Sequence, residues 1–311
     1  MASSMDKPAT GRAKHSRLAR PVLYVLLAFV GGLYALPLVW MASTSIKPER
    51  EALSDSVGLL PELPPAPTAA GAGDEISYAA RLAEQVAANY TAVIDAPNAD
   101  FQLYIRNSLI VAALSVAGMT ISSAVIAYGF SRIRWKGRDT LFLGVLATMM
   151  IPFTVIMAPQ FLLFKHLGWI GSWMPLWVPC WFGGGFSIFL LRQFYMGIPR
   201  ELDEAARLDG CGHLGTFWHV ILPLARPALV VVALLQFIAT WNDFTGPLVF
   251  INHPSQYTAG LGLQMYQTAH GGTPWNLIMA ASVIVIAPVM VVFLLAQRSL
   301  IEGVATQGLK D

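Results

Sequence analysis

Residues 107–130 read NSLIVAALSVAGMTISSAVIAYGF, a stretch without a charged side chain between Arg106 and Arg132. An α-helix rises about 1.5 Å per residue, so about 20 apolar residues cross the roughly 30 Å hydrocarbon core of a bilayer. This stretch is therefore long enough and apolar enough to be a membrane-spanning helix.

Five further apolar stretches of similar length follow the same pattern, and only one of them is interrupted, by Asp243. They cover residues 21–41, 140–164, 172–191, 227–250 and 275–297. The 311-residue chain is 55% hydrophobic and 12% charged, about half the charged share of a soluble domain. These features exclude a water-soluble globule and predict an all-α integral membrane protein with six transmembrane helices.

The basic residues of the short connections predict the orientation of these helices, because Lys and Arg gather on the cytoplasmic side. The short connections on the other side of the membrane contain a single basic residue, Lys165. We expect a multi-pass protein of the bacterial inner membrane with both termini cytoplasmic: a tail over 1–20, a transmembrane domain over 21–298 and a tail over 299–311. The first apolar stretch is longer than the core of an ordinary signal peptide, which favours a retained helix over a cleaved one. The cytoplasmic basic residues are Lys7, Arg12, Lys14, Arg17, Arg20, Arg132, Arg134, Lys136, Arg138, Arg192, Arg200, Arg207, Arg226, Arg298 and Lys310.

The connection 42–106 is long and is predicted to be external. Residues 59–73 are rich in Pro, Ala and Gly and predict an irregular linker. Beyond Asp74, a suitable N-cap, apolar residues recur at helical spacing over 76–90 and predict an amphipathic helix. Two interpretations remain open: a surface helix that covers the bundle, and a docking surface for a partner.

The connection 199–223 is too patterned for a simple turn. Three acids follow Pro199 where the helix dipole favours them, and Gly210 is suited to end that helix. Leu214, Phe217, Trp218 and Ile221 then form one apolar stripe of a second helix. The pattern predicts two short amphipathic helices on the cytoplasmic surface, which either pack against the bundle or lipid or are held by a cytoplasmic partner.

The residue types in this loop resemble the EAA signature of permease subunits in binding-protein-dependent ABC importers. That signature is E-A-A, three residues, G, nine residues, I, one residue, L-P, and the spacing matches throughout, with Val220 in place of Ile and Cys211 where Ala is common. The resemblance implies the type I permease fold of ABC importers, with a coupling helix between helices 4 and 5 that docks on an ATPase subunit. The implied coupling residues are Glu204, Ala205, Ala206, Asp209, Gly210, Leu214, Phe217, Leu222 and Pro223.

The resemblance extends along the chain to carbohydrate permeases, most closely to the second permease of the maltose type. It rests on Ser45–Pro48, Asn89-Tyr90, Asn107-Ser108, Trp241–Asp243 and the tail 297–310, whereas the external stretch 54–85 is longer than usual. It implies a homologous permease, two ATP-binding subunits and an external substrate-binding protein as partners, with membrane lipid around the helices. The loop 251–273 resembles the segment that contacts the binding protein.

The substrate implied by the resemblance is a mono- or oligosaccharide, moved by ATP-driven alternating access. Glycerol 3-phosphate or another non-sugar solute is the alternative, and an ATP-independent carrier is less favoured. No Gly-Lys dipeptide occurs, so a P-loop is excluded, and ATP and Mg²⁺ are expected on the partner ATPase. We expect no cofactor in this chain.

The chain offers no catalytic or metal-binding pattern. His213 and His219, and Cys180 and Cys211, lack ligand spacing, and a net charge of +2 gives no support to nucleic-acid binding. Asp243 is the one carboxylate in a predicted span, near the outer interface. Asp243 either makes a structural hydrogen bond or lines the transport pathway together with Asn242. Trp241 either stacks on a sugar or belongs to the belt of aromatic residues at the membrane interface.

Helix-disrupting residues lie within three of the predicted spans. Pro152 and Pro159 in the third and Pro247 in the fifth predict breaks in the helical hydrogen bonds. Gly183–Gly185 in the fourth predict a close approach of another helix.

Overall fold

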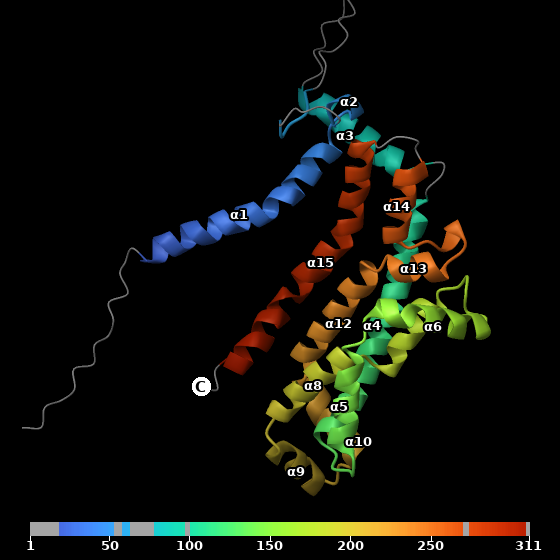
Figure 1. The fold of residues 1–311 in the computed structure, drawn as a ribbon. Helices are drawn as coiled ribbons and strands as arrows, with labels where there is room; N and C mark the ends of the chain where they lie inside the picture. The colour runs from blue at the N-terminus through green and yellow to red at the C-terminus, as the bar shows by residue number, and fades with distance from the viewer. Residues whose placement is uncertain (1–18, 53–57, 63–77, 97–99, 270–273, 309–311) are drawn as a thin grey trace, which may run out of the picture.

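The computed structural model describes residues 19–52, 58–62, 78–96, 100–269 and 274–308, and every regular element within these ranges is a helix (Figure 1). The all-α prediction is confirmed for this part of the chain. Residues 1–18 of the predicted N-terminal tail, residues 309–311 of the predicted C-terminal tail, most of the linker and the Asp74 cap lie outside the described residues.

Three long helices are continuous: α1 (Ala19–Ser45), α4 (Phe101–Ser131) and α15 (Trp275–Gly308). Helix α4 contains the whole stretch 107–130, and it begins where the Asp100 carboxylate accepts the Leu103 N–H at 2.9 Å, an N-cap that satisfies one free donor of the first turn. Four segments are long and apolar enough to cross a membrane: Pro21–Ser45, Phe101–Ser131, Met174–Gly197 and Trp275–Gln297.

The predicted third span is not one helix. Helices α5 (Arg138–Thr148) and α6 (Phe153–His166) meet at 97°. Pro152 has no N–H to bond the preceding turn, and it disfavours helical backbone at Ile151, so the helix ends before it. The predicted span 140–164 is therefore a bent pair, with the break at Pro152 as expected, whereas the break expected at Pro159 does not occur because α6 continues through it.

The predicted fourth span contains a change of helix type. Helices α7 (Met174–Trp177) and η1 (Val178–Phe182) precede α8 (Gly185–Gly197), with Gly183 at φ +83° between them. A Cβ on Gly183 would lie 2.9 Å from Cδ1 of Ile126 in α4. The close approach predicted for this glycine run is thus present.

The predicted fifth span ends early. Helix α12 (Arg226–Trp241) stops at a turn, and α13 (Thr245–Phe250) follows with Pro247 in its first turn, where a missing N–H costs nothing. The Asp243 carboxylate accepts a hydrogen bond from the Gly246 N–H at 2.9 Å. Local side-chain bonds of this kind compete with the backbone hydrogen bonds of a regular helix. Helix α12 also meets the preceding His213–Leu224 segment at 77°. The described chain thus has four spans by length and composition, or six if each bent pair is one span.

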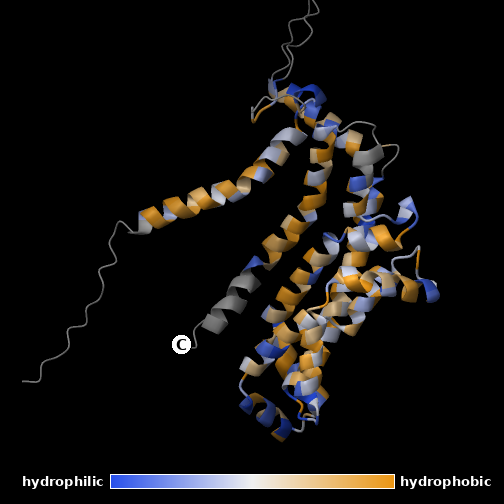
Figure 2. Cartoon of the chain, in the orientation of Figure 1, coloured by the Kyte–Doolittle hydropathy of each residue, from blue (hydrophilic) through white to orange (hydrophobic). Residues whose placement is uncertain are grey.

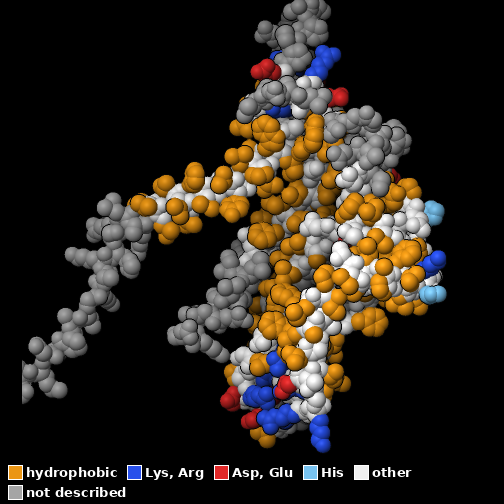
Figure 3. All heavy atoms as spheres, in the orientation of Figure 1, with side chains coloured by type: hydrophobic (Ala, Val, Ile, Leu, Met, Phe, Trp, Pro, Cys, Tyr) orange, Lys and Arg blue, Asp and Glu red, His pale blue; other side chains and the backbone are white. Residues whose placement is uncertain are grey.

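Helix α4 is the centre of the bundle, against α8, η1 and α12 (Figure 1). Two apolar clusters hold its ends. One cluster joins α4, α5, α8 and α12 around Leu191 and Tyr195, and the other joins α3, α4 and α15 around Phe101 and Tyr104. Charged side chains gather at the two ends of the bundle, with apolar surface between them (Figure 3), as burial of the middle in a bilayer requires.

Helix α1 extends away from the bundle and is apolar along its length (Figures 1 and 2). No part of its most apolar window is buried within the chain, and Phe29 is 71% exposed. Water cannot favourably cover so long an apolar surface, so lipid or another apolar surface is its environment.

One end of the bundle, called here the α3 end, carries α2 (Glu49–Ala52) and α3 (Tyr78–Ile94). Helix α3 confirms the helix predicted over 76–90 as far as the described residues reach. Asn89 donates to the carbonyls of Ser45 and Lys47 at 2.8 and 2.9 Å and accepts a hydrogen bond from Asn276 at 3.2 Å. The sequence features around Ser45 and Asn89 therefore meet, and they hold the ends of α1, α3 and α15 together.

Candidate functional site

The candidate site is the loop at the opposite end of the bundle, called here the α9 loop, residues 199–224. It contains α9 (Glu201–Leu208), α10 (His213–Thr216), the π-turn η2 (Phe217–Ile221) and α11 (Leu222–Leu224). Three acids occupy the first turn of α9, and Gly210, at φ +85°, follows it in the left-handed region. The prediction of two short helices around Gly210 is confirmed.

The π-turn has a local cause. Pro223 has no N–H, and its ring would collide with the carbonyl four residues earlier in a regular helix. The chain instead widens just before it, and the Leu222 N–H bonds the carbonyl of Phe217, five residues back.

The predicted apolar stripe is divided between two environments. Phe217 and Ile221 are 5% and 0% exposed and pack in the bundle core, whereas Leu214 and Trp218 are 83% and 63% exposed. The prediction of one stripe with one environment was wrong, because the bundle covers only one of the two adjacent i, i+4 rows. One row therefore packs on its own bundle, as one of the two interpretations predicts, and the other row is exposed. A cytoplasmic partner on the exposed row stays a prediction.

The residues implied by the EAA resemblance fall on two sides. Ala206 and Phe217 are buried, and Leu222 is half-buried. The exposed residues of this set are Glu204, Ala205, Asp209, Gly210, Leu214 and Pro223. Trp218 is exposed as well, so the loop exposes both acidic and apolar side chains.

Two ties fix the α9 loop to the bundle. Arg132, just after α4, pairs with Asp203 of α9 at 2.5 Å. The Tyr128 hydroxyl donates to the His213 carbonyl at 3.0 Å, and its ring lies 5.0 Å from that of Phe217. The sequence predicts Arg132 only as one of the basic residues of one side and predicts no role for Asp203 alone, because no local pattern shows that residues 71 positions apart meet.

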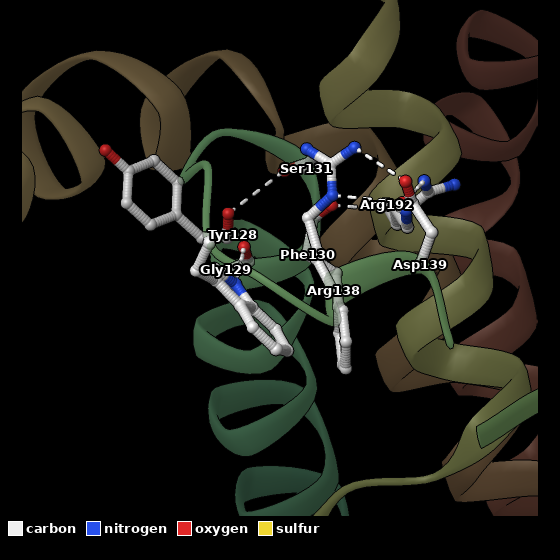
Figure 4. Close-up of polar contacts among 8 residues, drawn as sticks. Tyr128, Gly129, Phe130, Ser131, Arg138, Asp139 and Arg192 are labelled. Carbon is white, nitrogen blue, oxygen red and sulfur yellow. Dashed lines mark hydrogen bonds and ion pairs between the residues drawn. The ribbon is translucent and has the colours of Figure 1, made fainter. Parts of the chain in front are cut away.

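The end of α4 is also joined to α8, and through α8 to α5, as Figure 4 shows. Arg138 donates to the Asp139 carboxylate at 3.0 Å, and Arg192 of α8 lies 3.6 Å from the same carboxylate. Arg192 also donates to the Phe130 carbonyl at 3.3 Å. Asp139 is 73% exposed, so this is a surface ion pair of small energetic weight.

The residues predicted for a pathway lie where α12 ends. Trp241 is 3% exposed, and its indole N–H donates to the Val285 carbonyl at 3.0 Å, so its ring packs within the chain. Asn242 is exposed, and Asp243 makes the structural bond to Gly246. A pathway role for these residues stays a prediction.

A second group of side chains, whose contacts no local sequence pattern predicts, fixes the loop after α13 at the α3 end. This loop contains η3 (Pro254–Gln256) and α14 (Ala259–Ala269). Asn107 donates to the carbonyls of Ser255 and Tyr257, each at 3.0 Å, and the Ser108 hydroxyl accepts the Ala259 N–H at 2.8 Å. The first turns of α4 thus position the segment predicted to contact a binding protein.

These features define a class: a helical membrane protein whose core helices end in an amphipathic two-helix loop that is fixed on one side and exposed on the other. The chain matches the family model for the binding-protein-dependent transport system inner membrane component over residues 118–305. It belongs to this family and is a permease subunit of a binding-protein-dependent transport system.

Named relatives agree with this membership. The chain is 35% identical over 223 residues to the trehalose/maltose transport system permease protein MalG of Thermococcus litoralis, covering 71% of this chain and 80% of the relative. It is 29% identical over 294 residues to the arabinooligosaccharides transport system permease protein AraQ of Bacillus subtilis, covering 94% and 96%.

The fold is also found in a solved structure. A chain of a bacterial ABC transporter involved in the import of the acidic polysaccharide alginate superposes with a TM-score of 0.71 at 23% identity, covering 91% of this chain and 98% of that one. The expected ABC importer permease fold is confirmed.

Proposed function

We propose that this chain forms half of the translocation pathway of an ABC importer for a mono- or oligosaccharide. A homologous permease supplies the other half, two ATP-binding subunits bind ATP and Mg²⁺, and an external binding protein delivers the sugar. The proposal places the α9 loop and both termini in the cytoplasm. It counts the bent pair α5–α6 as one span and α12 as another, which gives six with the four long spans.

The observation that carries the proposal is the two-sided α9 loop. Its inner row, Phe217 and Ile221, packs in the bundle core, while Glu204, Leu214 and Trp218 are exposed. An exposed apolar row is unfavourable in water, and together with the exposed acid of the same loop it suits a groove on another protein with apolar walls and a basic residue. An ATPase docked there would push on the bundle through the inner row.

The sugar assignment is supported by the relatives, whose names refer to trehalose, maltose and arabinooligosaccharides. Glycerol 3-phosphate remains the alternative. Mass spectrometry of the ligand carried by the purified partner binding protein decides between them: a sugar supports the assignment, and a phosphate ester or peptide contradicts it.

The test of coupling is Glu204→Lys in the complex reconstituted in liposomes. Reversal of an exposed charge at the docking surface is expected to reduce retention of the ATPase on the purified permease and abolish ATP-dependent uptake. Glu84→Lys, the same reversal at an exposed position of α3, is the control and should import normally. Normal uptake by Glu204→Lys would refute the docking assignment, and uptake by the wild type without ATP would favour an independent carrier.

A further inference from the structure

A buried ion pair joins three helices at the base of the α9 loop. The Arg132 and Asp203 side chains are only 4% and 12% exposed. The guanidinium of Arg132 also donates to the Ile198 carbonyl at 2.8 Å and to the Tyr195 carbonyl. These carbonyls lie at the end of α8, where helical carbonyls lack partners within the helix. One side chain therefore holds the end of α4, the end of α8 and the start of α9.

The position of this arginine is not explained by membrane sidedness. Arg134 and Lys136, in the same turn, are exposed and satisfy the preference for basic residues on one side. Burying an ion pair costs desolvation that its attraction does not necessarily repay, so an apolar contact would hold the helices at least as well. What the pair adds is a fixed geometry, because a planar guanidinium orients several acceptors at once.

The pair connects the α9 loop to the central helix of the bundle. The Tyr128 hydroxyl bond to His213 is a second connection of the loop to α4. The 31 residues of α4 rise about 46 Å in all, and Asn107 and Ser108 hold the loop after α13 toward its other end. A displacement of α9 that preserves these bonds displaces α4 and the end of α8 with it.

We propose that Arg132 is a positioning residue that makes the α9 loop move as one body with α4 and α8, so that ATPase movement reaches the membrane helices. The proposal rests on the proposed function, since it needs an ATPase to displace the loop. Without the pair, the ATPase still docks on the exposed row, but α9 moves partly independently of the bundle.

The test is Asp203→Asn, which keeps the side-chain shape and removes the charge. In proteoliposomes with the complete complex, the ratio of ATP hydrolysed to sugar imported should rise about tenfold, a coupling loss within the range typical of linked sites. This ratio does not depend on how much complex assembles, so a merely structural defect leaves it unchanged. Asp139→Asn, which removes an exposed carboxylate that also contacts two arginines, is the matched control and should keep the wild-type ratio.

Asp203→Glu should restore most of the coupling, because it returns the charge. If Asp203→Asn does not assemble, Arg132→Lys replaces it, since lysine keeps the charge but cannot reach the same set of acceptors. An unchanged ratio, or a parallel fall of hydrolysis and uptake, would overturn the proposal.

A second measurement does not require transport. Spin labels at Leu208→Cys on α9 and Lys136→Cys after α4, both exposed positions, report the distance between these elements in the isolated full chain. Asp203→Asn should broaden the distance distribution, and an unchanged distribution would refute the role of the pair. If the wild-type complex shows no ATP-dependent uptake while the distribution still broadens, the proposed function fails and the mechanical tie stands.

Discussion

Asn107→Ala is expected to release the loop after α13 from the bundle. Asn107 is 1% exposed, and its amide donates to two backbone carbonyls, those of Ser255 and Tyr257, each at 3.0 Å. Alanine removes both donors and leaves both acceptors beside a helix that cannot serve them. A net hydrogen bond contributes about 0.5–1.5 kcal/mol, and a buried unpaired acceptor costs about 1–3 kcal/mol. The two bonds together therefore predict a loss of about 2–4 kcal/mol.

The loss should be local before it is global, because the loop opens without unfolding α4. Hydrogen exchange of the purified, detergent-solubilised chain measures it directly. The Ala259 amide, which donates to the Ser108 hydroxyl at 2.8 Å, is the reporter. Its exchange should accelerate by about 30- to 1,000-fold, since each 1.4 kcal/mol corresponds to a factor of ten.

The control is Gln102→Ala, an exposed amide on the same helix, which should change stability by no more than about 0.5 kcal/mol. If Asn107→Ala leaves Ala259 exchange at the wild-type rate, the two bonds do not hold the loop. Equal acceleration in both variants would show that the effect comes from α4 itself and not from the loop contacts.

Two more substitutions test the packing of the ends. In Gly262→Ala the new methyl would lie 2.2 Å from the ring of buried Tyr104, so this ring must move by more than about 1 Å. Chemical denaturation should show that the free energy of unfolding falls by about 1–3 kcal/mol. An unchanged denaturation midpoint would contradict that packing. Trp218→Ala should leave the stability of the isolated chain within about 0.5 kcal/mol of wild type yet weaken ATPase retention, whereas Phe217→Ala, one residue earlier but buried, should cost about 3–5 kcal/mol. Equal stability losses in the two would refute the two-sided loop.

The sequence was most informative about elements whose residues are close in the chain. Six apolar stretches each contain a helix, and the residues around 76–90 and 199–223 form the short helices expected from local periodicity. Gly210 ends α9 because a left-handed residue is a local requirement. These features follow from hydrophobic period, charge and turn chemistry, which a single sequence contains.

Bend angles and helix ends were less well predicted. Pro152 predicted the break in the third span but not its 97° bend, and the end of α12 at Trp241, where the Asp243 turn replaces a helical turn, was not predicted. Apolar composition indicates that a segment lies in lipid, but it does not distinguish a straight helix from a bent pair of the same length.

By itself the sequence determined that this protein lies in a lipid bilayer, that it is helical and that it has a patterned loop with the EAA spacing. Only the tertiary structure decided which face of that loop is free, through the burial of Phe217 and the exposure of Trp218. Only it showed that Arg132 reaches Asp203, 71 residues away, and that Asn107 holds Ser255, 148 residues away. The physical reason is that periodicity and composition act over a few turns of helix, whereas burial and long-range hydrogen bonds depend on which helices pack together.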